Sequence, residues 1–396
     1  MAWPVGAHAL DNQKNGYGGP LASLKVLELC QVAAGPFCGM LFADLGADVI
    51  KVETPAGDSM REWPPFNNGY SENFASLNRS KRSIALNLKA PEDRELLLQL
   101  VRDCDILLEN NRPGVMDRLG LGYEVLRTAN SALIVCSISA YGQTGPRANE
   151  GGFDLTIQGV AGVMSVTGEK GRPPIKCGVP ISDFTAGLYA AFSALAMVTE
   201  ARRTGRGAHI DTSMLGATLG VSALQTSQYF GTDADPEPLG SAHPRNAPYQ
   251  AFAAKDGYFV MAAGNDKLWA SVCEIVGRKD LLEDARFTRQ IDRAAHQVAL
   301  KDLLEAEFAR EGVSFWLEKL AKAGVPSGPI NTISQALADE QVVHSGWVQP
   351  LALPGGGVTR TFGSPIGISG RTKLSIGRPP ALDEHGAEIR AALKPA

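Results

Sequence analysis

The chain has 396 residues, of which 44% are hydrophobic and 20% charged, and a formal net charge of −4. This length is too great for one small core and predicts two domains, or one large domain with an insertion. The composition is that of an ordinary soluble globular protein, and the slightly acidic balance excludes a general attraction to nucleic acid or to an anionic membrane.

The cysteines and histidines give no sign of a metal site. The six cysteines are scattered, and none forms a C-x-x-C pair or has a histidine at zinc spacing. They are typical of reduced, mostly buried thiols in a cytoplasmic protein. Residues 1–20 lack a continuous apolar segment, so we expect a loose N-terminal extension and not a secretory signal. No apolar run reaches the roughly 18 residues of a membrane span.

Along residues 21–230, short apolar runs alternate with segments of helical periodicity. This alternation predicts βαβ units and hence a large α/β domain with a Rossmann-like, doubly wound parallel sheet. The predicted strands are residues 24–30, 48–53, 83–88, 105–110, 133–141 and the start of 207–215, and the predicted helices are 35–47, 90–104, 122–130 and 183–203.

Segments rich in proline and glycine divide the second half of the chain. We expect linkers at residues 231–249 and 325–333, and a small α+β domain between them at residues 250–324. That domain begins with a hairpin around the turn "KDG" and continues with helices. Residues 334–396 contain short helical segments and turns, and we expect them to return to the large domain.

The turn after the first predicted strand reads "LCQVAAGPFCG". A dinucleotide-binding unit needs G-x-G-x-x-G here, and the turn offers only Gly35 and Gly39, although Glu53 stands where a ribose-binding acid would be. We therefore expect no NAD. The turn still suits a phosphorylated ligand, because backbone N–H groups at a helix N-terminus favour anions.

Two aspartates precede apolar helical segments, Asp154 after two glycines and Asp183 at the start of the long helix. Each suits a turn or an N-cap, which is worth roughly 1 kcal/mol over alanine. Asp183 also suits a nucleophile, because a helix N-terminus keeps a carboxylate ionised and its N–H groups can hold an oxyanion. The residues alone leave both interpretations open.

Nine ordered blocks of the chain resemble the class III CoA-transferases, a superfamily that includes formyl-CoA transferase, carnitine CoA-transferase and the α-methylacyl-CoA racemases. The blocks are "GPFCGMLFADLGADVIKVE", "NRSKRSIALNLK", "ENNRPGVMDRLGLGY", "SAYGQTGP", "SDFTAGLYA", "GRGAHIDTSM", "HPRNAPYQAF", "AGVPSGPINT" and "LDEHGAEI". In the third of these blocks, the family has an aromatic residue where this chain has Asn111.

The resemblance implies that Asp183 is the nucleophile of a CoA transfer from an acyl-CoA to a free carboxylic acid, through aspartyl anhydride and aspartyl-CoA thioester intermediates. In the racemases, the matching aspartate works with a histidine directly before the residue that corresponds to Asp154. Here that position is Phe153, which can neither remove nor return a proton. We therefore predict a transferase, with a racemase or epimerase of the same fold as the alternative. A CoA-binding protein without activity is a third class, and it would not need Asp183.

The resemblance also implies an interlocked homodimer, in which each chain is a ring threaded through the other. Ala33 replaces a glutamine of formyl-CoA transferase, which argues against an oxalate or formate substrate. The loop with Arg245 suggests a dicarboxylate acceptor and succinyl-CoA as the donor, whereas an apolar pocket would favour a carnitine-like, bile-acid-like or aromatic acid. Coenzyme A thus enters as a substrate. Expected CoA-binding residues are Gln31, Val32, Ala33, Lys51, Arg82, Lys89, Asn110 and Arg118, with Arg79 a further basic candidate, and expected acyl-substrate residues are Phe153, Asp154, His243, Arg245 and Tyr249.

Overall fold

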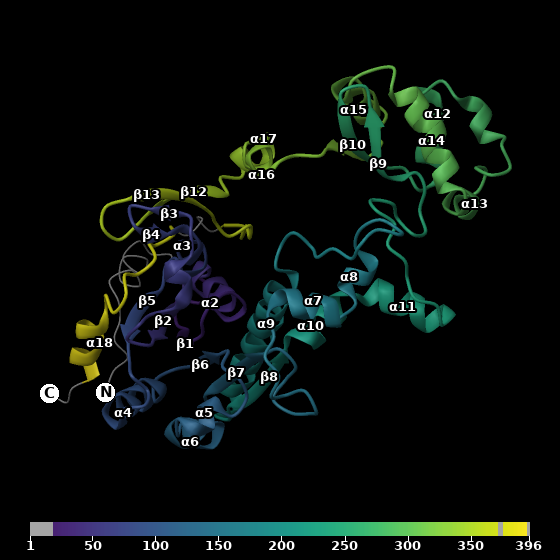
Figure 1. Cartoon of the computed structure of the whole chain (residues 1–396). Helices are drawn as coiled ribbons and strands as arrows, with labels where there is room; N and C mark the ends of the chain where they lie inside the picture. The colour runs from purple at the N-terminus through teal and green to yellow at the C-terminus, as the bar shows by residue number, and fades with distance from the viewer. Residues whose placement is uncertain (1–18, 371–374, 394–396) are drawn as a thin grey trace. The chain divides into compact units, whose positions relative to one another are not determined.

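The computed structural model describes residues 19–370 and 375–393, which form two compact units (Figure 1). The predicted N-terminal extension at residues 1–20 lies outside the described residues except for its last two. Each unit is described by itself. Unit 1 consists of the described residues up to Val163, Lys176–Ala234 and those from Gln341 onward, and unit 2 consists of Met164–Ile175 and Asp235–Glu340.

Unit 1 is built on a six-stranded sheet in which all neighbouring strands are parallel. Parallel strands need crossover connections, and the helical segments between the strands supply them. The first strand lies inside the sheet and the order is that of a Rossmann fold, so the predicted doubly wound α/β domain is confirmed. In spatial order the strands are β5 (Arg82–Ala85), β2 (Asp48–Glu53), β1 (Lys25–Leu29), β6 (Ile106–Glu109), β7 (Ile134–Ser139) and β8 (Ala208–Ser213).

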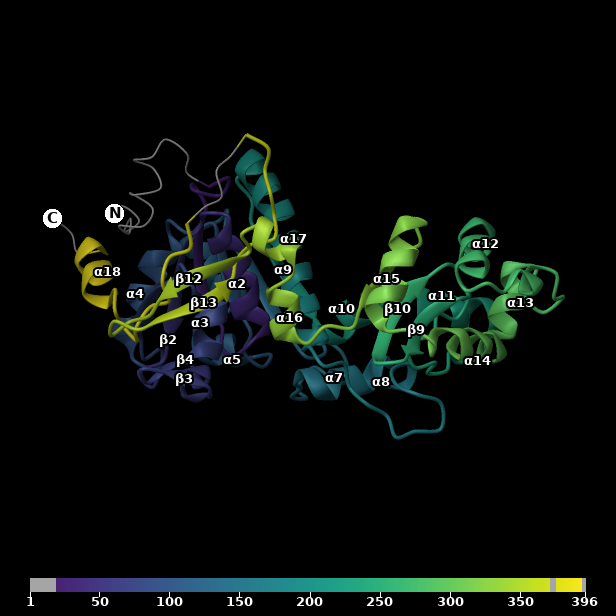
Figure 2. The ribbon, with the colours of Figure 1, turned by 90° about the horizontal axis from the view of Figure 1, so that it is seen from above.

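Helices cover both faces of this sheet, as the two views of the ribbon show (Figures 1 and 2). The central strands are almost wholly buried, and alternate residues enter different cores: Val26 of β1 packs on one side and Leu27 on the other. The first core is closed by α2 (Ala34–Asp44), α7 (Asp154–Val160), α9 (Ile181–Thr204) and α10 (Met214–Val221), and the second by α4 (Pro91–Val101), α6 (Tyr123–Ala129) and α18 (Gly386–Leu393).

Two short hairpins lie side by side at one end of unit 1, next to α3 (Figures 1 and 2). The Asn67 amide donates to the Val358 carbonyl at 3.2 Å, which joins the hairpins. The hairpin β12–β13 was not expected, because the sequence predicted only short helices and turns over residues 334–396. The glycines and the proline of "LALPGGGVTRTF" favour turns, so the two five-residue strands beside them were not recognised. The remaining elements of this unit are η1 (Ser59–Glu62), β3 (Phe66–Asn67), β4 (Tyr70–Ser71), α3 (Glu72–Asn78), α5 (Val115–Arg118), α11 (Ala223–Thr232), β12 (Val348–Ala352) and β13 (Val358–Phe362).

Unit 2 packs helices against a three-stranded antiparallel sheet, in which the expected hairpin around "KDG" is present. Its core is aromatic: the ring of Phe308 lies 5.5 Å from that of Phe252 and 4.9 Å from that of Phe259. Its elements are β9 (Tyr249–Ala254), β10 (Gly257–Ala262), β11 (Ser327–Pro329), α12 (Asp266–Ile275), η2 (Lys279–Leu282), α13 (Gln290–Ala295), α14 (Gln297–Phe308), α15 (Val313–Lys322) and α16 (Ile333–Leu337), while α8 (Val163–Val166) and α17 (Glu340–His344) span the unit boundaries.

The units differ from the predicted domains at several places. Residues 334–340, which were predicted to return to the large domain, belong to unit 2. Residues 164–175 belong to unit 2 and not to the large domain, because they pair with the segment that enters unit 2: the Gly240 N–H donates to the Gly168 carbonyl at 2.7 Å. The segment 325–333, expected as a linker, contains β11, which pairs with β10. Its backbone groups are thus part of the sheet.

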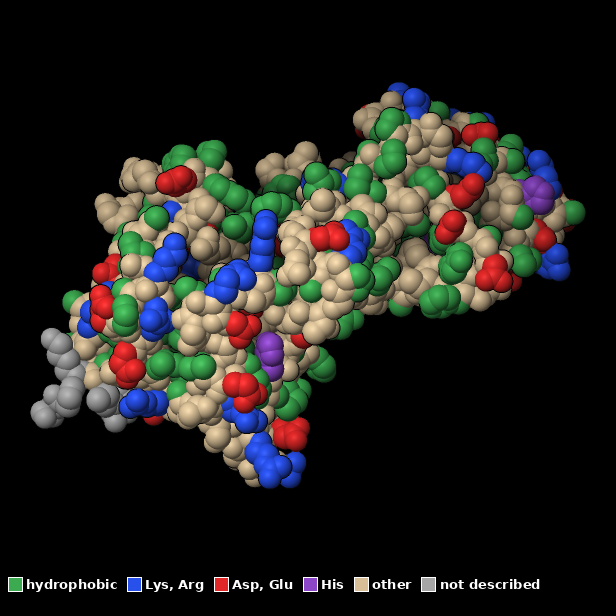
Figure 3. Space-filling view, turned by 60° about the horizontal axis from the view of Figure 1, so that its bottom comes forward, with side chains coloured by type: hydrophobic (Ala, Val, Ile, Leu, Met, Phe, Trp, Pro, Cys, Tyr) green, Lys and Arg blue, Asp and Glu red, His purple; other side chains and the backbone are tan. Residues whose placement is uncertain are grey.

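Within the described residues, α9 is long and apolar enough to span a membrane, by length and composition alone, although no membrane span was expected from the sequence. Of its most apolar stretch, 44% is buried inside the protein, and core helices meet the same criteria. Across the part of the chain that the structure describes, no three His, Cys, Asp or Glu side chains gather as a metal site requires. The face in Figure 3 carries acidic and basic side chains interspersed.

Candidate active site

The strand order of unit 1 reverses between β1 and β6, and ligands of doubly wound sheets bind at the carboxyl ends of the strands at such a switch point. Two of the predicted CoA-binding residues meet there. The Gln31 N–H donates to Asn110 Oδ1 at 2.9 Å, and Asn110 Nδ2 donates to the Gln31 carbonyl at 2.8 Å. The Asn110 side chain thus joins the loop after β1 to the loop after β6.

Val32, the next residue of this loop, has a φ of 66°. This left-handed conformation is unfavourable for a β-branched residue and costs of order 1–3 kcal/mol. The Val32 N–H donates to Asp58, at 3.3 Å from one carboxylate oxygen and 3.2 Å from the other. Ala33 is the N-cap of α2, and its carbonyl accepts the Phe37 N–H at 2.8 Å. The predicted residues 31–33 therefore form one fixed turn.

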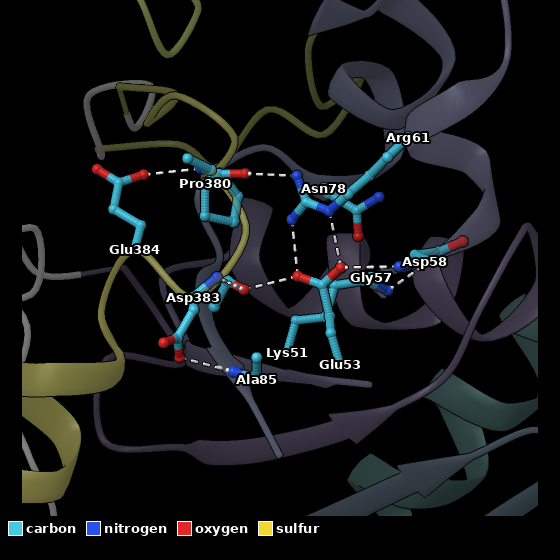
Figure 4. Close-up of polar contacts among 12 residues, drawn as sticks. Lys51, Glu53, Gly57, Asp58, Arg61, Asn78, Ala85, Pro380, Asp383 and Glu384 are labelled. Carbon is cyan, nitrogen blue, oxygen red and sulfur yellow. Dashed lines mark hydrogen bonds and ion pairs between the residues drawn. The ribbon is translucent and has the colours of Figure 1, made fainter. Parts of the chain in front are cut away.

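Asp58 connects this turn to a group of buried charges, which includes Lys51 and Glu53 (Figure 4). Lys51 Nζ lies 3.0 Å from Glu28 Oε1 and 3.0 Å from Asp58 Oδ2, and donates to the Cys30 carbonyl at 2.8 Å. The side chain is 0% exposed, and each of its three hydrogens has a partner. The expectation that Lys51 binds CoA is therefore corrected: its ammonium neutralises two buried carboxylates and is closed off from any ligand.

Asp58 remains ionised despite its burial. Desolvation on its own would raise the pKa of Asp58, but the charge of Lys51 and hydrogen bonds from the Met60 and Val32 N–H groups outweigh it, and the pKa lies below its ordinary value. The Asp58 N–H donates to Glu53 Oε2 at 3.1 Å. Glu53, at the place of a ribose-binding acid, is in turn bound by Arg61 and is buried.

Two further basic candidates serve the fold instead of a ligand. Arg82 is the first residue of β5, at the amino end of the strands, and its guanidinium binds Asp48 at 3.0 and 2.7 Å. Ligands of this fold bind at the opposite end, so its assignment to CoA is corrected. Arg79 is buried against Asp44, with contacts of 2.9 and 2.6 Å. These ion pairs tie the two arginines to the large unit.

Lys89 and Arg118 occupy positions that suit a ligand's phosphates. Lys89 lies in the turn after β5, Arg118 ends α5 after β6, and both side chains are exposed. They follow the carboxyl ends of their strands, where the switch point lies. Their role in CoA binding stays a prediction.

The first turn of α2 packs directly against the start of α9. Gly187, in the second turn of α9, permits this approach, because a Cβ there would lie 2.7 Å from the Ala34 carbonyl oxygen. Beside that contact, the rings of Phe37 and Phe184 stack with their centroids 4.5 Å apart. Asp183 directly precedes Phe184, so this packing brings it near the start of α2 and the switch point.

Asp183 is the third residue of α9, whose N-cap is Pro180, so the N-cap interpretation is wrong for Asp183. Its side chain is partly buried. Desolvation, and then repulsion from Asp154, raises the pKa of Asp183 to about 7. Carboxyl groups with strongly perturbed pKa values cluster at functional sites, because catalysis needs groups that change charge near the working pH.

Asp154 supplies the cap that α9 needs. Its Oδ1 accepts the Ser182 N–H at 2.8 Å and the Asp183 N–H at 3.4 Å, while its Oδ2 accepts Gln158 Nε2 at 2.7 Å. Asp154 is not the N-cap of its own helix, because it is the first residue of α7 and the N-cap is Phe153. Its carboxylate instead caps α9 and lies next to Asp183. Phe153, directly before Asp154, is 76% exposed.

The other three predicted substrate residues belong to unit 2 and form a cluster of their own. The His243 Nδ1 accepts the N–H groups of Arg245 and Asn246, each at 3.1 Å, and its ring lies 5.0 Å from that of Tyr249. Burial, and then Arg245, lowers the pKa of His243 below its ordinary value. That these residues meet Asp183 stays a prediction.

Two residues near the site are absent from the predicted set. Arg112, after β6, packs against the loop before α7: a Cβ on Gly151 would lie 2.8 Å from its guanidinium. Together with Glu109 of β6 and residues of β7, β8 and α6, Arg112 lines a cavity of about 400 Å³. Arg112 lies in a quoted sequence block and was within reach of sequence reasoning, whereas nothing in the sequence distinguishes Asp58.

The fold and the site together are those of an α/β enzyme: the carboxyl group of Asp183, with its raised pKa, lies near the switch point of a Rossmann-like sheet. Residues 21–386 match the family model described as CoA-transferase family III, and the chain belongs to that family. The resemblance drawn from the sequence blocks is thus confirmed, and with it the class of enzyme.

Similar proteins cover nearly the whole chain. It is 39% identical over 384 residues to a succinate–glutarate CoA-transferase of Agrobacterium fabrum, which spans 95% of this chain and 96% of the relative. It is 40% identical over 377 residues to an acetyl-CoA:oxalate CoA-transferase of Acetobacter aceti, with 94% and 95% covered. A crystal structure of a CaiB/BaiF family protein from Brucella suis is 40% identical and superposes with a TM-score of 0.85, covering 95% and 100%.

Proposed function

We propose that this chain moves CoA from succinyl-CoA to a free dicarboxylic acid, with Asp183 as the nucleophile. The observation that carries the proposal is the place of Asp183, partly buried in the first turn of α9 beside the start of α2, with a pKa of about 7. The names of the two relatives support the substrate class, since succinate, glutarate and oxalate are all dicarboxylates.

In the proposed mechanism, the Asp183 carboxylate attacks the thioester carbonyl, the C–S bond breaks, and an aspartyl–acyl anhydride and the CoA thiolate result. The thiolate attacks the aspartyl carbonyl, which releases succinate and leaves an aspartyl-CoA thioester. The acceptor carboxylate then attacks this thioester to form a second anhydride. The returning thiolate attacks the acceptor's carbonyl, so the new acyl-CoA leaves and Asp183 is regenerated.

The surroundings of Asp183 support these steps. Helix N-termini present N–H groups and partial positive charge, which stabilise the oxyanions of each attack. Partial burial removes water that would hydrolyse the anhydrides. Phe153 offers an apolar cover and no proton, which favours transfer over racemisation. Lys89 and Arg118 are the proposed contacts for the CoA phosphates, with Gln31–Ala33 and Asn110 at the thioester end.

Exposed apolar side chains on α9, α10 and α11 support a homodimer of interlocked chains. Phe192 is 75% exposed and Phe230 is 78% exposed. Large apolar patches mark interaction surfaces. In the proposed dimer a second copy covers them and contributes His243, Arg245 and Tyr249 to the acceptor site. The free cysteines and CoA substrates suit a cytoplasmic enzyme. The exposed set is Leu188, Tyr189, Phe192, Leu219, Val221, Leu224, Tyr229 and Phe230.

The test is to incubate the protein with succinyl-CoA and a panel of C4–C6 dicarboxylic acids, and to identify new thioesters by mass spectrometry. We expect wild type to form the acceptor's CoA thioester and Asp183→Ala to form none. Aromatic and carnitine-like acids are tested in the same way as a comparison panel of acids that are not dicarboxylates. Proton exchange at the α-carbon of a 2-methylacyl-CoA in deuterated water, without any transfer, would establish the racemase instead.

A further inference from the structure

Asp58 accepts a hydrogen bond from the turn at the switch point, and no step of the proposed transfer uses it. We propose that Asp58 is a positioning residue, which fixes the Gln31–Ala33 turn for the CoA thioester by holding the amide of Val32. The inference rests on the proposed function, because it gives this turn to the CoA.

Both carboxylate oxygens of Asp58 are engaged in contacts. The residue is 2% exposed, and both its oxygens accept the Val32 N–H, at 3.3 and 3.2 Å. Its Oδ1 also accepts the Met60 N–H at 3.0 Å and so caps η1. Lys51 Nζ lies 3.0 Å from Oδ2. The carboxylate is therefore a bridge between the Val32 amide and a buried cation.

The groups that hold Asp58 are themselves held by ion pairs and hydrogen bonds, several of which are drawn in Figure 4. Lys51 is held by Glu28 on the neighbouring strand, and its partner carbonyl, that of Cys30, directly precedes the turn. The Asp58 N–H is held by Glu53, which Arg61 binds through two hydrogen bonds of 2.8 and 2.7 Å. A chain of charges thus anchors the turn to the centre of the sheet.

The hydrogen bond from the Val32 N–H to Asp58 matters because it holds Val32 in a conformation with positive φ. A φ of 66° is unfavourable for valine, so without a partner for its N–H, Val32 would return to negative φ. The peptide groups on either side would rotate with it. Gln31, whose N–H and carbonyl both bind Asn110, would lose that pairing, and the start of α2 beside Asp183 would shift.

The first test compares Asp58→Asn with Asp44→Asn. Both changes remove a buried carboxylate from an ion pair, but Asp44 binds Arg79 and has no contact with the turn. Binding of free CoA is measured by calorimetry, alongside KM for succinyl-CoA and kcat. We expect Asp58→Asn to weaken CoA binding and raise KM about tenfold, as for one lost hydrogen bond to a charge, with a smaller change in kcat. Asp44→Asn is expected to lower the unfolding temperature similarly and to keep the affinity.

The second test uses Val32 itself. Glycine adopts positive φ without strain, so in a Val32→Gly background the change Asp58→Asn should weaken CoA binding by less than about threefold. Val32→Pro removes the N–H and enforces negative φ while the ion pairs stay intact, so it tests the same idea if Asp58→Asn fails to fold. It should bind CoA at least as weakly as Asp58→Asn.

Three outcomes overturn the inference: wild-type CoA affinity in Asp58→Asn, wild-type affinity in Val32→Pro, or an equal loss with glycine at position 32. Calorimetry needs no turnover, so the inference and the proposed function fail separately. A wild type that binds CoA through this turn but transfers nothing contradicts only the function. Transfer with no dependence of binding on Asp58 contradicts only the inference.

Discussion

Asp154 and Asp183 lie together at the start of α9, where the Asp154 carboxylate accepts hydrogen bonds from the Ser182 N–H and from Gln158. The same geometry that caps the helix places a negative charge beside Asp183. Since burial is the largest cause of the raised pKa of Asp183 and Asp154 the second, the two contributions are separable by mutation.

Activity should therefore depend on pH through Asp183. The nucleophile is the ionised form, so kcat/KM should rise as pH rises through about 7 and level off above it. Asp154→Asn removes the neighbouring charge, while its amide oxygen can still accept the Ser182 N–H. We expect the acid limb of the pH profile to move to lower pH, though not to that of a free aspartate, because burial remains.

The control is Glu150→Gln, which removes an exposed carboxylate that pairs with Arg147 in the loop before α7. Its pH profile should match that of wild type. An acid limb near pH 4 in wild type, where a free aspartate titrates, would show that the pKa of Asp183 is not raised. An unchanged limb in Asp154→Asn would show that the two carboxyl groups do not interact.

Asp183 could be located because its block is specific to the family, whereas Lys51 was assigned to CoA only because it is a basic residue in a matching block. The signal for the correct role was present. Glu28 and Lys51 are opposite charges in the middle of two buried strands, and the register pairs them directly. Opposite charges at matching depths in neighbouring strands indicate a buried ion pair.

At the scale of elements, the contact between α2 and α9 sets the distance from the nucleophile to the CoA-binding turn. The two helices touch through backbone at Gly187 and Ala34 and through the stacked rings of Phe37 and Phe184. Small residues permit such close packing, and any added atom pushes the helices apart.

Gly187→Ala should thus impair activity more than it impairs folding. The new Cβ would lie 2.7 Å from the Ala34 oxygen and 2.9 Å from Phe37, and overpacking of this kind typically costs about 1–3 kcal/mol. Displacement of Asp183 should lower kcat/KM by about tenfold to a hundredfold. Gly257→Ala is the matched control, because its Cβ meets only Val313 at 3.8 Å. Equal activity of the two variants would contradict this view of the contact.

The elements that the sequence predicted best are those whose burial is uniform. The strand at residues 48–53 agrees residue for residue with β2, and the long helix differs from α9 by two residues at its start and one at its end. The hairpin β12–β13 escaped because most of its residues stay partly exposed and only Leu351 and Thr361 are buried, so no apolar run marks it. Edge elements of this kind are fixed by tertiary contacts, which local patterns do not contain.

At the scale of the whole molecule, the exposed apolar side chains of α9, α10 and α11 make the proposed dimer testable. Phe192→Glu is expected to weaken the dimer, because it places a charge in a dry interface. Sedimentation velocity should then show a smaller species, with activity lost in parallel. Val298→Glu, at a 73% exposed site on α14, is the control and should remain dimeric. A monomeric wild type would contradict the proposal.

The construction of unit 1 from distant parts of the chain has a consequence for its biosynthesis. Ile389 and Leu393 of α18 complete the core that β5, α4 and α6 begin, more than 250 residues earlier in the chain. A nascent chain that carries all six strands still lacks this piece, so the sheet emerges from the ribosome with one face partly open. The first part of unit 1 to be synthesised therefore completes its core last. In the time between, this open face is accessible to chaperones and proteases.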